Sequence, residues 1–388
     1  MTNKPDTNLG GIKIQGETAG DIGEARQKFM HRLQELGLDF WVTTIEKINT
    51  SSRFIHFQLR KDIAQEWMPD GDTTQLCQKL NLDTECSTSD LEREILLSML
   101  AGPEAFDLPS YNELASAVRI RKNIVEAARK TVLAFDTEEA ERPKDYGVYS
   151  EATGFTILPG EPLITALQAA TQPSTSGKLY SFSCYRATEY VILLAIAQEL
   201  QITNPKLHHQ LQKQWENRAI KSGEFHDIFM REYGSMTVPL PPKYYVPGDR
   251  LWFRNPDELS ANIMGYEGSW VFYLGNGLFS NFWKQDQPYT LTSKCLEVFH
   301  WRNAAYADEA GIFKIDEAIV EELTRTSINN QLKTEQILQE MLNFREPQGV
   351  YISGGCIDTS REYPRYVCPE TCDLILPNSA IKLNIDER

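Results

Sequence analysis

Apolar residues occupy nearly all sides of a helical pattern that runs over residues 185–200. A surface helix carries its apolar residues on one stripe, whereas a helix that is apolar all round lies inside a protein. The longest apolar run within it, residues 190–197, is too short to span a bilayer. The pattern therefore predicts a buried central helix, and with 388 residues the chain is long enough to enclose it in a sizeable core.

Cys184 stands directly before this helix. The first backbone N–H groups of a helix have no partner within it, and the helix dipole places positive charge at the same end. Both effects favour the thiolate, which is the nucleophilic form of cysteine. The position indicates Cys184 as a candidate nucleophile. The alternative is a small buried residue without a chemical role, which is common for free cysteines.

Composition argues against several classes of protein. The net charge is −15, so we expect no general nucleic-acid binding and no attachment to anionic membranes. The N-terminus lacks the apolar stretch of a signal peptide, and seven cysteines without repeated spacing argue against a disulfide framework. We therefore expect a soluble, cytoplasmic protein, with export by another route left open. The sequence does not indicate an oligomeric state.

The chain divides into four segments by pattern. Residues 1–21 are polar and rich in Gly and Thr, which is typical of a flexible tail. Residues 22–90 carry a helical pattern with Asp21 as its cap and two short strands, which predicts a small α/β N-terminal extension. Residues 91–305 form the central part, and residues 306–388 predict a helical and strand-rich C-terminal extension.

The central part combines helices with strands. An amphipathic helix capped by Asn112 precedes the buried helix, and Asn276-Gly277 is a strong signal for a two-residue hairpin turn. Strands are predicted around this turn and before it, at residues 244–246, 251–253, 268–274 and 278–279. A nucleophile helix packed on an antiparallel sheet is the layout of papain-like enzymes. The sequence therefore predicts an α+β fold with a papain-like core.

Similarity to a known family extends over about residues 95–305. It is carried by segments that follow one another in the family's order and with similar spacing, at residues 121–128, 180–184, 185–200, 247–256 and 268–275. These segments resemble those of the compact bacterial transglutaminases associated with spore coats, which are protein-glutamine γ-glutamyltransferases with a papain-like core. The terminal segments lie outside the resemblance, so we expect a transglutaminase-like core with N- and C-terminal extensions.

The resemblance implies cysteine-dependent acyl transfer. In this chemistry a thiolate attacks the carboxamide of a protein glutamine, ammonia leaves, and the acyl group passes to a lysine amine, which crosslinks proteins. Water in place of the amine gives deamidation. Cys184 matches the nucleophile, and its own N–H or that of Tyr185 would donate to the oxyanion. The implied partners are protein substrates with accessible glutamine and lysine.

The resemblance implies neither a metal nor an organic cofactor. Cys356, Cys368 and Cys372 lie near one another in the sequence. A zinc site needs about four ligands, and no histidine accompanies these three cysteines. We expect them to be structural.

Three positions depart from the family's pattern. Ser183 stands where a carboxylate precedes the cysteine, and Ser269 stands where a second carboxylate follows the glycine that opens a strand. The family's histidine aligns near Asn281 or Phe282. The pKa of serine is too high for it to accept a proton near neutral pH, so these residues do not replace the missing groups directly.

Two other residues are candidates for proton transfer. Glu267 lies two positions before Ser269, and residues i and i+2 of a strand share a face, unless a bulge at Gly268 intervenes. An exposed turn carboxylate is the alternative. His226, next to Asp227, is the other candidate, because histidine is the usual base near neutral pH.

Three functions remain open at this point. The first is an active acyltransferase in which Cys184 works with Glu267 or His226. The second is a catalytically silent or weak relative that presents its cleft to a protein partner, which the three departures favour. The third is a papain-like amidase acting on peptides or cell-wall fragments, since a fold does not fix its substrate.

Overall fold

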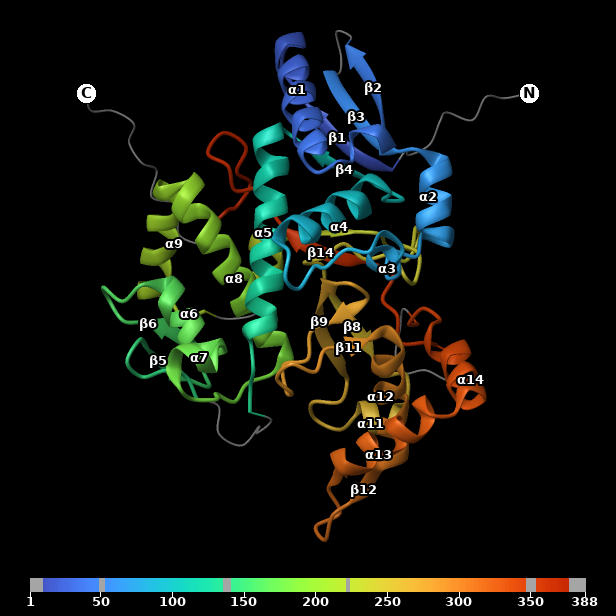
Figure 1. Ribbon diagram of the computed structural model, residues 1–388. Coiled ribbons are helices and arrows are strands. Elements are labelled where there is room, and N and C mark those ends of the chain that lie inside the picture. The colour runs from blue at the N-terminus through green and yellow to red at the C-terminus, as the bar shows by residue number, and fades with distance from the viewer. Residues whose placement is uncertain (1–9, 49–52, 135–140, 221–223, 347–353, 377–388) are drawn as a thin grey trace.

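The computed structural model describes residues 10–48, 53–134, 141–220, 224–346 and 354–376. They form an α+β fold with a four-stranded sheet and a six-stranded sheet, as predicted. Figure 1 shows the four-stranded sheet at the top, the long central helices beside the six-stranded sheet, and the C-terminal helices below it. Within these residues, no helix combines the length and the apolar character that crossing a membrane would require.

The four-stranded sheet has the order β2-β3-β1-β4. Its strands are β1 (Gly11–Gln15), β2 (Val42–Ile48), β3 (Arg53–Leu59) and β4 (Ala105–Leu108). β1 pairs antiparallel with β3 and parallel with β4. The prediction of a flexible tail over residues 1–21 is therefore wrong for its described part, because β1 lies between β3 and β4 and its Ile12 and Ile14 side chains are fully buried.

Helix α1 (Ala19–Glu35) packs on this sheet through Ile22, Phe29 and Leu33. The cap is Thr18, and the prediction that Asp21 caps the helix is wrong. Asp21 instead completes a capping box: its carboxylate accepts the Thr18 N–H at 2.7 Å, and its own N–H donates to the Thr18 hydroxyl at 3.2 Å.

The six-stranded sheet has the order β11-β10-β9-β8-β14-β7, and all of its pairs are antiparallel. The strands are β7 (Met230–Tyr233), β8 (Arg250–Arg254), β9 (Gly268–Gly275), β10 (Leu278–Phe279), β11 (Tyr289–Thr290) and β14 (Arg361–Pro364). β14 comes from the segment predicted as a C-terminal extension, yet it lies between β7 and β8. That segment is therefore part of the main sheet.

The turn between β9 and β10 has the predicted form. Asn276 and Gly277 both have left-handed backbone angles, with φ of 54° and 71°, which a two-residue hairpin turn with positive φ at both positions requires. The predicted strand at residues 244–246 is wrong. Tyr245 and Val246 are buried, but their N–H groups donate to the Thr73 hydroxyl and to the Asp249 carboxylate instead of to a neighbouring strand.

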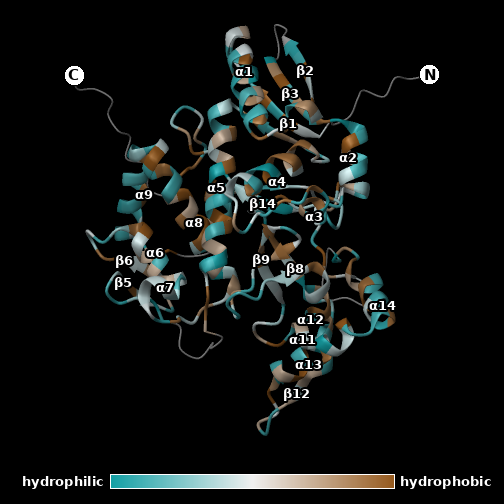
Figure 2. Cartoon of the chain, viewed as in Figure 1, coloured by the Kyte–Doolittle hydropathy of each residue, from teal (hydrophilic) through white to brown (hydrophobic). Residues whose placement is uncertain are grey.

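Helix α8 (Cys184–Thr203) is the buried central helix that the sequence predicts. Figure 2 shows its strongly hydrophobic character, and every residue from 190 to 197 is fully buried. It packs against α5 (Tyr111–Lys130), α6 (Leu163–Thr171), α9 (Pro205–Asn217) and β9. Ser110 caps α5, since its side chain accepts the Glu113 N–H, so the prediction of Asn112 as the cap is wrong.

The C-terminal helices are α12 (Leu291–Ala304), α13 (Glu317–Ile328) and α14 (Gln331–Met341), and all three pack together. A hairpin of β12 (Ala305–Ala307) and β13 (Phe313–Ile315) joins α12 to α13. The remaining elements are α2 (Lys61–Trp67), α3 (Leu76–Leu80), α4 (Thr88–Leu100), α7 (Pro173–Ser176), α10 (Phe225–Phe229), α11 (Glu258–Ala261), β5 (Gly147–Ser150), β6 (Gly154–Ile157) and the short 3₁₀ turns η1 (Asp39–Trp41) and η2 (Pro69–Gly71).

Candidate active site

Cys184 is the first residue of α8, and Ser183 is its N-cap. The Ser183 hydroxyl accepts a hydrogen bond from the Arg186 N–H at 3.3 Å, which is the contact that makes serine a favoured N-cap. Serine therefore has a structural task at the position where the resemblance expects a carboxylate. The helix that it caps packs on β9, so the nucleophile helix lies against an antiparallel sheet, as predicted.

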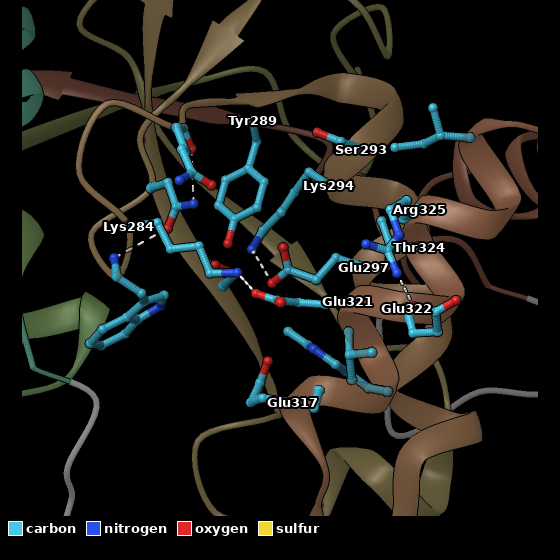
Figure 3. A pocket seen from close by; sticks show the side chains of 18 of the residues that line it. Lys284, Tyr289, Ser293, Lys294, Glu297, Glu317, Glu321, Glu322, Thr324 and Arg325 are labelled. Atoms are coloured by element: carbon cyan, nitrogen blue, oxygen red, sulfur yellow. Dashed lines mark hydrogen bonds and ion pairs between the residues drawn. The ribbon is translucent and has the colours of Figure 1, made fainter.

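The Cys184 side chain lines a cavity of about 800 Å³. Gly268 and Ser269, at the start of β9, form one part of its wall, and Tyr289 of β11 forms another. Further parts of the wall come from residues 265–266, from the segment 281–288, from one face of α12, and from α13 with Asn329 that follows it. The cavity thus lies between the main sheet and the C-terminal helices, and Figure 3 shows the charged side chains that point into it.

Burial raises the pKa of the Cys184 thiol above its ordinary value. The Trp270 backbone and the Lys294 ammonium act in the opposite direction, without cancelling the effect of burial. The backbone groups at the helix start favour the thiolate, as expected, but they do not lower the pKa below its ordinary value. Loss of solvation around sulfur outweighs the favourable contacts, because desolvation penalises the charged form of any acid.

A buried ion pair occupies the α12 side of the cavity. The Lys294 ammonium lies 3.1 Å from Glu297 Oε1, and the two side chains are only 1% and 18% exposed. The ammonium also lies 4.1 Å from the centroid of the Tyr289 ring, where a cation–π attraction operates. Burial and the charge of the Glu297 carboxylate raise the pKa of Tyr289, which keeps its hydroxyl protonated.

Three further contacts lie around the cavity. Lys284 pairs with Glu321 of α13, and within α13 Arg325 pairs with Glu322. The Tyr266 hydroxyl donates to Glu317 at the start of α13. Partial desolvation of its carboxylate raises the pKa of Glu317, although the residue as a whole is exposed, and the nearby Glu297 adds to this effect.

Ser269 and Asn281, which stand at two of the family's partner positions, also line the cavity. The Asn281 amide donates to the Gln287 carbonyl at 2.9 Å. Phe282 is buried in the core instead. Two of the expected partner positions, Ser269 and Asn281, therefore lie at the cavity, but neither side chain is a base near neutral pH.

Glu267 lies outside this arrangement. β9 begins at Gly268, so Glu267 belongs to the preceding turn, and the alternation of faces along a strand does not extend to it. Its side chain is exposed, and it is absent from the described residues that line the cavity. Gly268 has an extended φ of 159°, and a Cβ there would lie 2.2 Å from Trp252 Nε1.

His226 lies on α10 and pairs with Glu362, with 3.0 Å between Nδ1 and Oε1. This hydrogen bond raises the pKa of His226. Glu362 also pairs with the buried Arg250, whose guanidinium stacks on Tyr185 and Trp270 at 4.7 and 4.2 Å from the ring centroids. Of the residues that the structure describes, those lining the cavity do not include His226.

The sequence reasoning missed Lys294, Glu297 and Tyr289. A usable signal was present, because Thr290 is followed three residues later by Ser293 in a capping box that starts α12. Lys294 and Glu297 are then i, i+3 neighbours on the new helix, which places them on one face. The sequence does not show that this face of α12 lines the same cavity as Cys184.

Comparisons with known proteins find similar sequences and a similar solved structure. The sequence model of the family described as protein-glutamine gamma-glutamyltransferase matches residues 70–363, which include Cys184 and the cavity walls. A protein-glutamine gamma-glutamyltransferase from Halalkalibacterium halodurans is 25% identical over 203 residues, covering 50% of this chain and 65% of that protein. The chain thus spans less than two thirds of the length of this curated relative.

A solved structure of a transglutaminase from Geobacillus stearothermophilus, without its C-terminal extension, is also similar. It shares 18% sequence identity with a TM-score of 0.39, over 56% of this chain and 98% of that structure. The family match, by contrast, covers well over half of the present chain. The chain belongs to the protein-glutamine gamma-glutamyltransferase family.

Proposed function

We propose that this protein is a cysteine-dependent acyltransferase that acts on glutamine side chains of other proteins, with Cys184 as the nucleophile. The observation that carries the proposal is the position of Cys184 at the start of a buried helix, with its thiol in a cavity that polar and charged groups line. Membership of the family supports the same chemistry.

The reaction divides into two halves. Cys184 Sγ attacks the carboxamide carbon, the carbon–nitrogen bond breaks, and ammonia leaves a thioester behind. A lysine amine of a second protein then attacks the thioester carbon and releases Sγ, which forms an isopeptide crosslink. Water in the same position would give glutamate, so crosslinking and deamidation differ only in the second nucleophile. Proteins with accessible glutamine and lysine side chains are the proposed substrates.

The start of α8 offers donors for the oxyanion of each half-reaction. The backbone N–H groups of Cys184 and Tyr185 stand in the first turn of α8, and both lower the pKa of the thiol. The next two N–H groups of the helix are already bound to Ser183: that of Arg186 donates to the Ser183 hydroxyl, and that of Ala187 donates to the Ser183 carbonyl. Preorganised N–H donors of this kind stabilise tetrahedral intermediates.

The test is incorporation of a fluorescent primary amine into a glutamine-rich acceptor protein. Wild type should label the acceptor, and Cys184→Ala should not. Cys86→Ala is the matched control, because Cys86 is an exposed free cysteine far along the chain from the cavity residues, and it should label as wild type does. Equal labelling by wild type and Cys184→Ala would rule out the proposal. Ammonia release measured without amine separates deamidation from crosslinking.

A second function is favoured by a specific observation. Burial raises the pKa of the Cys184 thiol, and serines occupy two of the positions where the family has carboxylates. Both facts suit a catalytically weak or silent relative that binds a protein through the cavity. Absence of labelling by wild type, with a known transglutaminase labelling the same acceptor, would favour this function.

We propose the cytoplasm as the location. All seven cysteines are free thiols, including the pair Cys295 and Cys356, whose sulfur atoms lie 3.6 Å apart. Neighbouring thiols stay reduced in a reducing compartment. Fractionation with an antibody against the chain tests this, and recovery outside the cell would contradict it.

A further inference from the structure

The cavity contains one charged pair that is withdrawn from solvent. Lys294 is 1% exposed and its partner Glu297 is 18% exposed. Lysine is almost never buried to this extent without a partner, since taking an ammonium out of water carries a large desolvation penalty. The aromatic rings of Tyr289 and Trp301 surround the ammonium, at 4.1 and 5.8 Å from their centroids.

The other charges of the cavity differ from this pair. Lys284 and Glu321 are 44% and 57% exposed, and Arg325 and Glu322 are 71% and 60% exposed. Solvent screens such pairs, so they exert little force on a sulfur inside the cavity. Glu317 is the remaining carboxylate of α13 at the cavity; the residue is exposed overall, although its carboxylate, bound to the Tyr266 hydroxyl, is partly desolvated. Lys294 and Glu297 are the charged groups there that water screens least.

The pair and the thiol act on one another. The Lys294 charge lowers the pKa of Cys184, and the charge of the Cys184 thiolate acts on Tyr289. Tyr289, Lys294 and Glu297 all line the same cavity as Cys184. Sulfur, ammonium, phenol and carboxylate thus share one cavity, to which α8, α12 and β11 contribute them.

On the basis of the proposed acyl transfer, we infer that Lys294 and Glu297 together replace the proton-transfer groups that this chain lacks at Ser183 and Ser269. Glu297 takes the proton from Cys184 Sγ, and the Lys294 ammonium then faces the thiolate. The exchange creates no net charge in the cavity, because one anion replaces another beside the same cation. This removes the main obstacle to ionising a buried thiol.

The carboxyl group of Glu297 carries the proton in both half-reactions. When Sγ forms its bond to the carboxamide carbon, the carbonyl electrons move to oxygen. On collapse the carbon–nitrogen bond breaks, and the nitrogen takes the proton from Glu297 and leaves as ammonia. Glu297, again a carboxylate, then accepts a proton from the amine that attacks the thioester. That proton returns to Sγ when the product leaves.

The test uses variants that remove one charge each. Alkylation of Cys184 by iodoacetamide is followed against pH by mass spectrometry of the peptide that contains it, which reports the thiol pKa without any need for turnover. Lys294→Met should raise that pKa by about one unit, because the thiolate loses its counter-charge. Glu297→Gln should lower it, because an anion beside the thiolate is gone and the ammonium is unpaired.

Turnover should respond differently from the thiol pKa. Glu297→Gln should reduce amine incorporation at least about tenfold although its thiol ionises more readily, since proton transfer typically contributes a factor of 10² to 10⁴. Arg302→Met is the matched control. Arg302 lies on the same helix and pairs with Glu340 at 3.1 Å, but it is absent from the described residues that line the cavity. It should leave the thiol pKa unchanged.

Lys294→Met and Glu297→Gln should thus shift the pKa of the Cys184 thiol in opposite directions. A purely structural role of the pair would shift this pKa in the same direction in both variants. Lys294→Arg keeps the charge and should keep the thiol pKa. If Lys294→Met does not fold, Glu297→Gln alone decides: a thiol pKa that stays constant or rises overturns the inference. Labelling by wild type that survives Glu297→Gln would overturn it too, while leaving acyl transfer intact. Absence of Cys184-dependent labelling in wild type would refute acyl transfer and, with it, the inferred role in turnover.

Discussion

The Tyr266 hydroxyl donates to Glu317 Oε1 over 2.5 Å and so ties the turn before β9 to the first residue of α13. The ring of Tyr266 also packs edge-on against Trp301 of α12. These contacts hold the C-terminal helices against the sheet at the edge of the Cys184 cavity. The C-terminal segment is therefore a wall of the site as well as the source of β14.

Removal of this hydrogen bond should loosen the wall. Tyr266→Phe should lower the free energy of unfolding by about 1 kcal/mol, which is typical for one hydrogen bond in a partly solvated setting. A double-mutant cycle with Glu317→Ala, measured by urea unfolding, should give a coupling energy of similar size. Strict additivity of the two single variants would contradict the contact.

A second prediction concerns the close approach at Gly268. A Cβ there would lie 2.2 Å from Trp252 Nε1 and 2.6 Å from the Phe253 carbonyl oxygen. Gly268→Ala should therefore cost about 2–3 kcal/mol of stability, as overpacking does. It should also reduce amine incorporation, because Ser269 and the start of β9 form part of the cavity wall.

Gly23→Ala is the control for this substitution. Gly23 lies within α1, and a Cβ at this position would have nothing within 4 Å of it. Alanine there should raise stability by up to about 1 kcal/mol, since glycine weakens a helix interior. Thermal unfolding of both variants gives the comparison, and a Gly268→Ala protein as stable as wild type would contradict the packing at β9.

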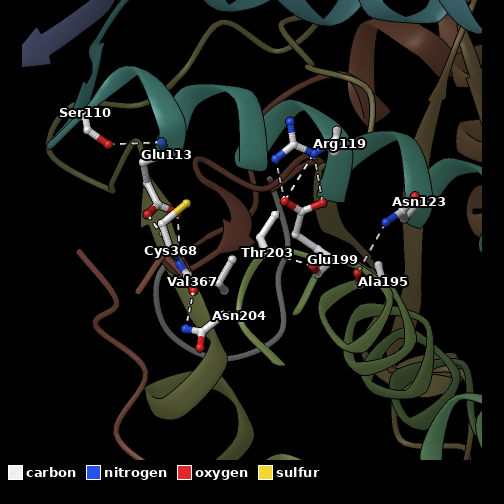
Figure 4. A network of polar contacts seen from close by, with 10 residues as sticks. All are labelled: Ser110, Glu113, Arg119, Asn123, Ala195, Glu199, Thr203, Asn204, Val367 and Cys368. Atoms are coloured by element: carbon white, nitrogen blue, oxygen red, sulfur yellow. Dashed lines mark hydrogen bonds and ion pairs between the residues drawn. The ribbon is translucent and has the colours of Figure 1, made fainter. Parts of the chain in front are cut away.

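A third prediction concerns the contact between the two central helices. Figure 4 shows the Arg119 guanidinium of α5 on both carboxylate oxygens of Glu199 in α8, with distances of 2.7 to 3.2 Å. Glu199 is 1% exposed, whereas Arg119 is 46% exposed. Arg119→Met leaves a buried carboxylate without its cation and should cost about 1–2 kcal/mol after allowance for solvent screening.

A positive charge at position 119 is not sufficient to replace the contact of Arg119 with both Glu199 oxygens. Arg119→Lys should recover only part of the loss, because one ammonium does not match both oxygens. Urea unfolding of the three proteins is the measurement. Arg325→Met serves as the control, since its pair with Glu322 is exposed on both sides and should contribute little. An equal effect of Arg119→Met and Arg325→Met would refute the prediction.

A fourth prediction follows from the fully buried carboxyl of Glu94. It accepts hydrogen bonds from the Tyr273 hydroxyl at 2.9 Å and from the Asn276 N–H at 3.0 Å. Burial nevertheless raises the pKa of Glu94. A group with a raised pKa in the folded state stabilises the fold fully below its unfolded pKa, near 4.3. That contribution is lost as the pH rises through the folded pKa.

Glu94→Gln removes this titration. Its free energy of unfolding relative to wild type should therefore increase between pH 4 and pH 8. Urea unfolding of both proteins at intervals across this range provides the measurement. A difference that stays constant with pH would show that Glu94 has no raised pKa in the fold.

The sequence predicted those parts of the fold that depend on local patterns. Helix α8 follows from apolar residues on all its sides, and the β9–β10 hairpin follows from Asn276-Gly277. Residues 244–246 were wrongly predicted as a strand because aromatic and β-branched residues are enriched in strands and also in buried irregular segments. β14 joins the sheet from far along the chain, and local patterns carry no signal for such pairing.

The site was predictable only in part, for the same reason. Cys184 stands at a helix start, which a sequence reveals. Lys294 and Glu297 reach the cavity because α12 returns to the end of α8, and that return is a matter of tertiary packing. The helix start favours the thiolate, as expected, but the opposing effect of burial on the thiol pKa depends on the tertiary packing of the C-terminal helices around the cavity.

The last prediction compares the carboxylate of Glu297 with the partners that the sequence suggested. Glu267 is exposed in a turn, and His226 is paired with Glu362. Since neither belongs to the described residues that line the cavity, Glu267→Gln and His226→Gln should retain amine incorporation within about twofold, far less than the loss expected for a proton-transfer group. Glu297→Gln in the same assay should lose at least about tenfold. A large loss in either of the first two variants, with stability and the thiol pKa of Cys184 unchanged, would return proton transfer to that residue and remove it from Glu297.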